Sequence, residues 1–351
     1  MRIAQGLLIG TVAAAIGVVC LWQFGCEDKP TEPRPPQQPK DYPVYFINYL
    51  DATLFTYYPL SRRIDSAALG LGPQRRVAVS ADGQLLYVAG PSNVVVLNAK
   101  SLDFVCELPY TARWGVVASP DNRLIAIMGD GLTILRTGDF TEVFVDPVKV
   151  MDGVFSADSR TFYAHGRDGV GHFTYLYWLT PLPSNPVLYQ RELQSHVGYI
   201  SPLKDGHRLA LYLTNYFVMY DIVADSNIFA CPLWPGAGNL GVTLDEKYAF
   251  FSNPSTMFFE EGTTDLYVFD IEGNQICDTI VIDYFMDSIG AIAAYGVGRM
   301  VFTPDRRWMV AHNAQEPVQL LLFDLEKQSL VDFRLFGNNC WFGNISMQLI
   351  R

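Results

Sequence analysis

A pattern of two apolar runs joined by a short turn with an aspartate recurs along the chain. It is clearest in VAVSADGQLLYVAG at residues 77–90, and it returns in VVASPDNRLIAIMGD from residue 116. The turn aspartates are Asp82, Asp121, Asp158, Asp205, Asp245 and Asp305, with separations of 39, 37, 47, 40 and 60 residues. A period near 40 residues, lengthened in places by insertions, is typical of a β-propeller.

Each copy predicts four strands in an antiparallel meander. In four of the six first turns, SADG, SPDN, SADS and TPDR, Ser or Thr precedes Ala or Pro, and the Asp carboxylate can accept hydrogen bonds from nearby backbone. Two further strands follow, as in NVVVLNAKSLDFVCELP and LYVFDIEGNQICDTIVI, with Asn98 and Asp270 at equivalent positions before the second turn. Such a unit cannot bury its own faces, so successive units are expected to pack around a ring.

The two ends of the repeat region predict how the ring closes. Six complete units occupy residues 77–335, while residues 42–65 offer three strands and NISMQLIR, residues 344–351, offers one. Pairing the ends would complete a seventh blade and remove free sheet edges. We therefore expect an all-β, seven-bladed β-propeller of four-stranded antiparallel blades, with N- and C-terminal strands sharing one blade. A six-bladed ring with unpaired ends is the alternative.

The copies resemble the YVTN-type, YncE-like repeats of bacterial seven-bladed propellers, which are similar to WD repeats. The best matches are SADGQLLYVAG, residues 80–90, and TPDRRWMVAHN, residues 303–313. The copies near residues 153 and 240 depart from the pattern, because they lack the turn glycine and carry insertions. The resemblance covers residues 42–351 and implies a fold rather than one activity, since such propellers serve binding, scaffolding and occasionally catalysis.

The first residues predict export from the cytoplasm. Residues 1–26 carry an early cation, Arg2, and then a long apolar run, which is typical of a signal peptide and nearly long enough to span a bilayer. Gly25 before Cys26 resembles the end of a bacterial lipobox, although Gln23 stands where Leu is usual. Lipidation of Cys26, an uncleaved membrane anchor and simple secretion are the three alternatives.

The segment at residues 27–41 predicts a tether rather than a folded domain. It is rich in Pro, Glu, Gln and Lys and has no apolar period. Such a composition cannot bury a core and stays extended. The predicted organisation is therefore a signal or anchor at residues 1–26, a Pro-rich tether at 27–41 and a propeller domain at 42–351, located in the cell envelope.

Composition restricts the partners of the chain. The formal net charge is −11, which repels phosphate backbones and argues against nucleic-acid binding. Beyond Cys20 and Cys26, four cysteines remain, and they form no CxxC or CxxCH pattern for a metal or haem. The expected membrane contact therefore runs through the N-terminal lipid or anchor, and no cofactor is predicted.

Candidate binding residues gather on one face of the expected ring. Connections from the fourth strand to the next blade, and from the second strand to the third, share this loop-rich face. The short aspartate turns share the opposite turn face. Long insertions at residues 165–172, 253–265 and 283–299 fall on the loop-rich face, and variable loops on rigid scaffolds commonly bind partners. The candidate ligand- or partner-binding residues are Arg113, Trp114, His165, His196, His312 and Trp341.

No pattern in the sequence specifies a reaction. The chain lacks GxSxG, HExxH and phosphate-binding glycine motifs. Its histidines lack the spacing of a ligand set, and Glu260, Glu261 and Asp265 lack a calcium-loop pattern. No catalytic residue and no metal site are therefore predicted.

The expected function is a membrane-tethered, extracytoplasmic binding or scaffold module with a protein partner on the loop-rich face. The alternative is an envelope hydrolase of the lactonase-like kind, or a redox accessory subunit, using the central mouth of the propeller. Lactonase-like sites carry no short motif, so the sequence leaves enzyme activity open.

Overall fold

The structure is a computed structural model that describes most of the chain from residue 40 onward. The described residues are 40–48, 50–73, 76–167, 172–178, 187–193, 197–213, 216–233, 239–254, 263–283, 297–313, 319–327, 329–336 and 342–347. From residue 41 onward they belong to one unit, Asp41–Arg351. The predicted signal segment and most of the predicted tether lie outside the described residues. Within the described ranges, no helix is long and apolar enough to cross a membrane.

The strands form four-stranded antiparallel sheets, here called blades. Blade 1 consists of β4 (Arg76–Val79), β5 (Leu85–Ala89), β6 (Val94–Asn98) and β7 (Phe104–Leu108). Blade 2 consists of β8 (Gly115–Ala118), β9 (Leu124–Met128), β10 (Leu132–Arg136) and β11 (Glu142–Asp146). Blade 3 consists of β12 (Val150–Phe155), β13 (Thr161–Arg167), β14 (His172–Trp178) and β15 (Val187–Leu193).

The remaining blades repeat this arrangement. Blade 4 consists of β16 (Val197–Pro202), β17 (Arg208–Leu213), β18 (Tyr216–Asp221) and β19 (Ser226–Pro232). Blade 5 consists of β20 (Leu240–Val242), β21 (Tyr248–Pro254), β22 (Thr263–Asp270) and β23 (Gln275–Asp283). Blade 6 consists of β24 (Val297–Phe302), β25 (Trp308–Asn313), β26 (Gln319–Asp324) and β27 (Ser329–Leu335). Blade 7 consists of β28 (Phe342–Met347), β1 (Val44–Asn48), β2 (Thr53–Tyr58) and β3 (Arg63–Ala68).

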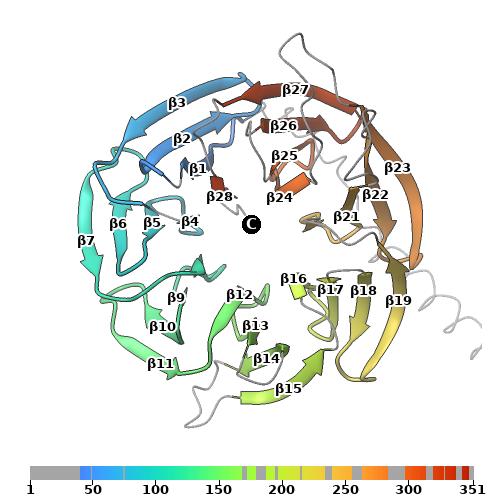
Figure 1. The fold of residues 1–351 in the computed structure, drawn as a ribbon, viewed down its shortest axis with the longest axis horizontal. Helices are drawn as coiled ribbons and strands as arrows, with labels where there is room; N and C mark the ends of the chain where they lie inside the picture. Colours follow the sequence, from blue (N-terminus) through green and yellow to red (C-terminus); the bar gives the residue numbers. More distant parts are fainter. Residues whose placement is uncertain are drawn as a thin grey trace, which may run out of the picture. The chain divides into compact units, whose positions relative to one another are not determined.

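The first strand of every blade belongs to an inner ring around the propeller axis (Figure 1). Strands β4, β8, β12, β16, β20, β24 and β28 contact one another in that order, and β28 contacts β4 again. The ring closes through antiparallel pairing of β28 with β1, where Val44 lies opposite Met347 and Phe46 opposite Ile345. The predicted seven-bladed propeller with a shared terminal blade is therefore confirmed.

The hydrophobic core lies between the blades rather than inside them. Each of the seven interfaces holds a cluster of buried apolar side chains from both neighbours. Between blades 4 and 5, for example, the rings of Phe217 and Phe251 stack with centroids 4.2 Å apart. Burying one large apolar side chain stabilises a fold by about 1.5–3 kcal/mol. Most of this energy is therefore available only when neighbouring blades meet.

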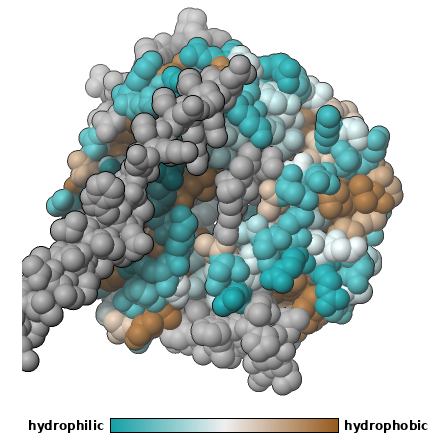
Figure 2. Space-filling model, turned by 180° about the vertical axis from the view of Figure 1, so that it is seen from behind, coloured by the Kyte–Doolittle hydropathy of each residue, from teal (hydrophilic) through white to brown (hydrophobic). Residues whose placement is uncertain are grey.

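The outermost strands expose much of their surface. Phe104 and Val105 on β7 and Val145 on β11 are 65%, 48% and 53% exposed. Figure 2 shows apolar residues as small groups separated by hydrophilic ones on the face seen from behind. Scattered exposed apolar residues of this kind are normal on soluble surfaces.

The six predicted aspartate turns share one geometry. In blade 1, the Ser80 carbonyl accepts a hydrogen bond from the Gly83 amide at 2.9 Å. The Asp82 carboxylate accepts from the Ser80 hydroxyl at 2.6 Å and from the Gln84 amide at 3.0 Å. The residue after each Asp is left-handed, with φ between +59° and +77°, at Gly83, Asn122, Ser159, Gly206, Glu246 and Arg306. The turns lacking glycine therefore keep the same backbone conformation.

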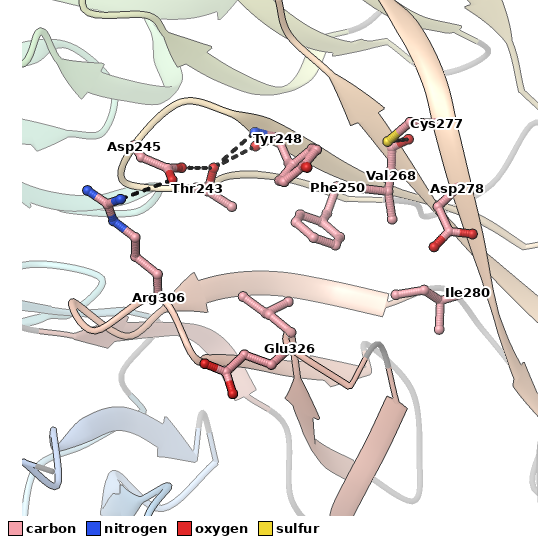
Figure 3. A pocket seen from close by; sticks show the side chains of 11 residues that line it. Thr243, Asp245, Tyr248, Phe250, Val268, Cys277, Asp278, Ile280, Arg306 and Glu326 are labelled. Atoms are coloured by element: carbon pink, nitrogen blue, oxygen red, sulfur yellow. Dashed lines mark hydrogen bonds and ion pairs between the residues drawn. The ribbon is translucent and has the colours of Figure 1, made fainter.

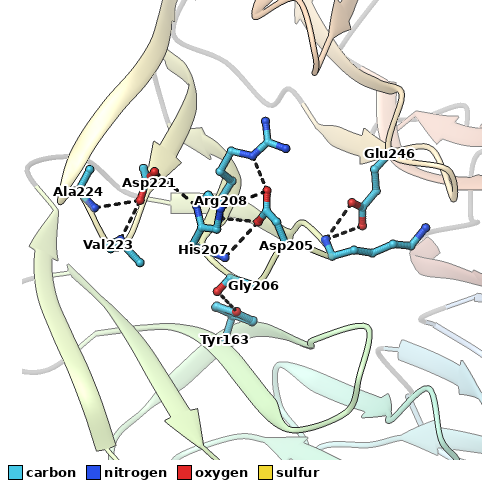
Figure 4. A network of polar contacts seen from close by, with 10 residues as sticks. Tyr163, Asp205, Gly206, His207, Arg208, Asp221, Val223, Ala224 and Glu246 are labelled. Carbon is cyan, nitrogen blue, oxygen red and sulfur yellow. Dashed lines mark hydrogen bonds and ion pairs between the residues drawn. The ribbon is translucent and has the colours of Figure 1, made fainter. Parts of the chain in front are cut away.

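In five of these turns, the left-handed residue also contacts the preceding blade. The contacts are Asn122 with Asp82, Ser159 with Asp121, Gly206 with Tyr163, Glu246 with Lys204 and Arg306 with Asp245. Figure 4 shows those on either side of blade 4, where the Tyr163 hydroxyl donates to the Gly206 carbonyl and the Lys204 amide donates to Glu246. A left-handed non-glycine residue costs roughly 1–2 kcal/mol, and an inter-blade hydrogen bond offsets part of that cost.

The aspartate turns make the fold sensitive to acid. The Ser156 hydroxyl and the Arg160 amide donate to Asp158 and hold its pKa below the usual value, against the opposing effect of partial burial. Burial also opposes the lowering at Asp121, Asp205 and Asp245, but hydrogen bonds to these carboxylates outweigh it and leave their pKa values lowered.

We expect stability to fall as the pH drops below about 4, because a carboxylate with a depressed pKa stabilises the fold fully above its unfolded value of about 3.9 and progressively less as the pH falls toward its folded value. Urea unfolding at pH 7 and pH 3 measures the loss, and Asp158→Ala at pH 7 should cost about 1–2 kcal/mol. Asp65→Ala, on exposed β3, is the control and should cost little. A parent protein equally stable at both pH values would contradict the prediction.

Candidate functional site

Three consecutive inner strands place different residues at one equivalent position on the loop-rich face. Arg76 on β4 lies opposite Ala89, and Gly115 on β8 lies opposite Met128. Asp152 on β12 lies opposite His165, after a β-bulge that shifts the register of this strand. A bulge of this kind changes where a side chain points. At this equivalent position of the inner strand, blade 1 therefore has an arginine, blade 2 a glycine and blade 3 an aspartate.

Arg76 bridges this set by crossing the middle blade. Its Nη1 lies 3.1 Å from Asp152 Oδ1, and the two side chains are only 19% and 11% exposed. Gly115 provides the room, because a Cβ atom there would lie 2.4 Å from Arg76 Cδ. Gly115 also has a φ of +135°, which side chains disfavour. The ion pair therefore joins blade 1 to blade 3 across β8.

Above this pair, at the start of β8, lie two predicted binding residues. Arg113 is half-exposed and its Nη1 is 3.8 Å from Asp130 Oδ1. Trp114 is partly buried against the cluster between blades 2 and 3, and its amide donates to the Met128 carbonyl at 2.9 Å. The Lys149 ammonium, just before β12, lies 5.3 Å from the Trp114 ring centroid. The structure therefore brings Arg113 and Trp114 together with a second cation.

The two described candidate histidines lie elsewhere. His165 and His312 are the fifth residues of β13 and β25, in blades 3 and 6, and are 1% and 4% exposed. This corrects the expectation that both line an open mouth: each belongs to a second strand, which lies behind the inner ring. His165 still takes part in the site as the cross-strand neighbour of Asp152. His312, three blades away, does not.

The remaining predicted residues cannot be placed. His196, Trp341 and the predicted lipidation site Cys26 lie outside the described residues. Within the described ranges, no group of three or more His, Cys, Asp or Glu side chains could hold a metal ion.

Sequence reasoning missed the Arg76–Asp152 pair and the role of Gly115. Arg76 reads as part of a connection, but it is the first residue of β4. The available signal was the alignment of the repeats, in which RVAV, GVVA and DGVF begin at equivalent points. Arg76 and Asp152 lie two repeats apart, with Gly115 at the same position of the repeat between them. This pattern indicates an ion pair only if the three repeats are assumed to be neighbouring blades of a ring.

This arrangement favours recognition over proton transfer. Asp152 and Arg76 neutralise each other in a largely buried position, where leaving either charge without its partner is costly. Arg113 and Asp130 are exposed, and the partly buried Trp114 and Lys149 lie beside them, so the group supplies two cations, a carboxylate and an aromatic ring. Arginine and tryptophan are among the residues that dominate binding energy at interfaces.

Comparisons with known proteins identify the fold but not a family. No protein-family model matches the sequence, and no curated protein matches it. The structure is similar to a 6-phosphogluconolactonase-like protein from Bacteroides fragilis, with a TM-score of 0.64, 10% identity, and coverage of 89% of this chain and 99% of that one. It is also similar to dihydro-heme d1 dehydrogenase NirN, with a TM-score of 0.58, 15% identity, and coverage of 90% and 78%.

A protein from Lactobacillus plantarum is a third similar structure, with a TM-score of 0.62, 11% identity, and coverage of 88% of this chain and 99% of that one. At such low identities the likeness establishes the β-propeller fold alone. The resemblance of the repeats to the YVTN type and the bacterial lipoprotein character stay predictions.

Proposed function

We propose that this propeller is a binding module that holds a protein partner on its loop-rich face, above blades 1 to 3. The N-terminal segment would tether it to the outer side of a bacterial cell membrane, through a lipid on Cys26 or an uncleaved anchor. The proposal rests mainly on one observation. The buried charges Arg76 and Asp152 are engaged with each other, while the exposed Arg113 and the partly buried Trp114 and Lys149 precede β8 and β12 beside them.

A second candidate function is that of an envelope hydrolase of the lactonase-like kind or a redox accessory subunit. The similarity to a 6-phosphogluconolactonase-like protein and to NirN favours it. Turnover of lactones or redox dyes by the purified protein, lost in Asp152→Asn, would support this candidate over the first.

Blade 2 offers a matched pair of arginines for testing the binding face. Arg113 lies on the loop-rich face and Arg123 on the turn face, and each is exposed and has one aspartate partner. A photoreactive residue at position 113 should crosslink one partner in whole cells, whereas the same residue at position 123 should not. Crosslinking from position 123 but not from position 113 would contradict the proposal, because the partner would then bind the turn face.

Once that partner is purified, its affinity measures the contribution of single residues. Arg113→Ala or Trp114→Ala should weaken binding by about 1–4 kcal/mol, because a central Arg or Trp commonly dominates an interface. Arg123→Ala should leave the dissociation constant unchanged. Normal binding by both Arg113→Ala and Trp114→Ala would contradict the proposed face.

The tether is tested separately. Cys26→Ser should release the protein from membranes or leave an unprocessed precursor, because firm attachment takes more than one acyl chain and a lipidated cysteine can carry several. Cell fractionation and intact mass measure the outcome. Unchanged mass and unchanged membrane retention would instead favour an uncleaved anchor.

A further inference from the structure

A cavity of about 460 Å³ lies between blades 5 and 6 on the turn face, opposite the candidate site (Figure 3). Six segments contribute to it: the first turns of blades 5 and 6, strands β21, β22 and β23, and the last turn of blade 6. Small-molecule sites in proteins have volumes of about 300–1,000 Å³. The cavity therefore has the size of a ligand site.

One residue on β23 distinguishes this interface from those after blades 1, 2 and 4. Asp278 occupies an outer-strand position that holds Cys106 in blade 1, Phe144 in blade 2 and Phe229 in blade 4. Those three side chains pack against the apolar clusters of their own interfaces. An aspartate resists burial more than any of these three residues and is shorter than phenylalanine, so it does not fill the space that Phe144 and Phe229 fill in blades 2 and 4. Blade 5 thus replaces a packing residue by a carboxylate.

The lining carries more negative than positive charge. It contains three carboxylates, Asp245, Asp278 and Glu326, and one guanidinium, Arg306. Arg306 Nη1 lies 3.3 Å from Asp245 Oδ2, so these two groups largely neutralise each other. Among the described residues, no cation pairs with Asp278 or Glu326; Asp278 accepts a hydrogen bond from the adjacent Thr279 amide. Two carboxylates therefore remain available to a ligand.

The equivalent residue of blade 6 shows what a purely structural aspartate looks like. Asp332 occupies the same outer-strand position, and its carboxylate accepts from the Tyr57 hydroxyl at 3.3 Å. Arg334 lies 3.2 Å from the same oxygen. The Asp332 carboxylate therefore has a hydrogen-bond donor and a cation within the protein, whereas Asp278 lines a cavity.

Apolar side chains form the rest of the wall. Phe250 and Val268 are each 4% exposed, and Ile280 and Leu325 are partly buried beside them. Figure 3 shows Phe250 between the Asp245–Arg306 pair on one side and Asp278 on the other. We propose that this cavity binds a small organic cation, an amine whose apolar body contacts Phe250 while its ammonium group pairs with Asp278.

Phenylbutylamine is a suitable probe for the full chain, with phenylbutanol and phenylbutyrate as neutral and anionic analogues of the same shape. Calorimetry gives the affinities. The exposed thiol of Cys277 lines the cavity and reports occupancy, because a bound ligand should slow its alkylation. Burial raises the pKa of this thiol, so the labelling is done in alkaline buffer and followed by peptide mass mapping.

The amine should bind and protect Cys277, and the alcohol should bind at least about fivefold more weakly, a partly screened charge contact being worth about 1 kcal/mol. Asp278→Asn should weaken the amine by a similar factor and leave the alcohol unchanged. Asp332→Asn, the matched control, should change neither. Asp278→Phe, which copies blades 2 and 4, should abolish binding of both probes without lowering the melting temperature.

Several results would overturn the proposal. They are no measurable amine binding at millimolar concentration, equal affinity for all three probes, unchanged amine affinity in Asp278→Asn, or amine binding that leaves Cys277 alkylation unaffected. Loss of amine binding in Asp332→Asn would also overturn it, because that residue lies outside the cavity.

Discussion

Removal of residues 342–351, which include all of β28, is expected to cost several kcal/mol, of the order of the whole stability of a domain at 5–15 kcal/mol. Strand β28 pairs with β1 and contacts the inner strands of blades 6 and 1. Without it, the backbone groups of β1 that face β28 lose their partners, and the ring opens. Urea unfolding and light scattering should show a lower midpoint and aggregation through the new edge.

A shorter deletion provides the control for this experiment. Removing only residues 348–351 leaves every residue of β28 in place, and this variant should unfold like the parent. If the longer deletion also unfolds like the parent and stays monomeric, pairing between the two chain ends does not stabilise the ring.

Breaking the Arg76–Asp152 pair is expected to give the second largest effect. Arg76→Met leaves a carboxylate that is only 11% exposed without this cation, and Asp152→Leu leaves a guanidinium that is 19% exposed. Removing one partner of a buried pair typically costs about 3–5 kcal/mol, because an uncompensated charge remains. The double variant should cost less than the sum of the single ones. Urea unfolding of all four proteins gives the coupling energy.

Gly115 provides an independent check of that geometry. Gly115→Ala should destabilise the parent strongly, because the new Cβ atom meets Arg76 Cδ and the positive φ disfavours a side chain. In an Arg76→Ala background the clash is absent, so the same change should cost less. Equal costs in both backgrounds, or single variants of the ion pair that cost under about 1 kcal/mol, would show that Arg76 does not cross β8 in solution.

The repeat predicts the fold because each aspartate turn is specified by a few neighbouring residues and the same pattern occurs several times along the chain. Each aspartate turn binds its own backbone, so Asp82 and Asp158 could be recognised from neighbouring residues alone. The left-handed positions of Ser159 and Glu246 could not be recognised in this way. Neither residue favours that conformation, and the side chain of each accepts a hydrogen bond from the preceding blade rather than from its own turn.

Residues of the candidate site were harder to predict, because their roles depend on register between distant repeats. The HGRDG stretch reads as a loop, but β13 continues through Arg167, so His165 is a buried strand residue. The unusual setting of Asp278 is visible only after the outer strands are aligned through their bulges, which places it level with Phe144. Neither the buried strand position of His165 nor the alignment of Asp278 with Phe144 can be recognised from the residues next to them in the sequence.

The pairing of β28 with β1 also sets the time at which the chain can complete its fold during translation. Of the described strands, β1 is synthesised first and β28 last, yet they are hydrogen-bonded neighbours. Contacts between distant parts of a sequence form slowly, and incomplete sheets expose edges that aggregate. The nascent propeller therefore carries an unpaired β1 edge until its final strand leaves the ribosome, and this is the interval in which a chaperone would matter most.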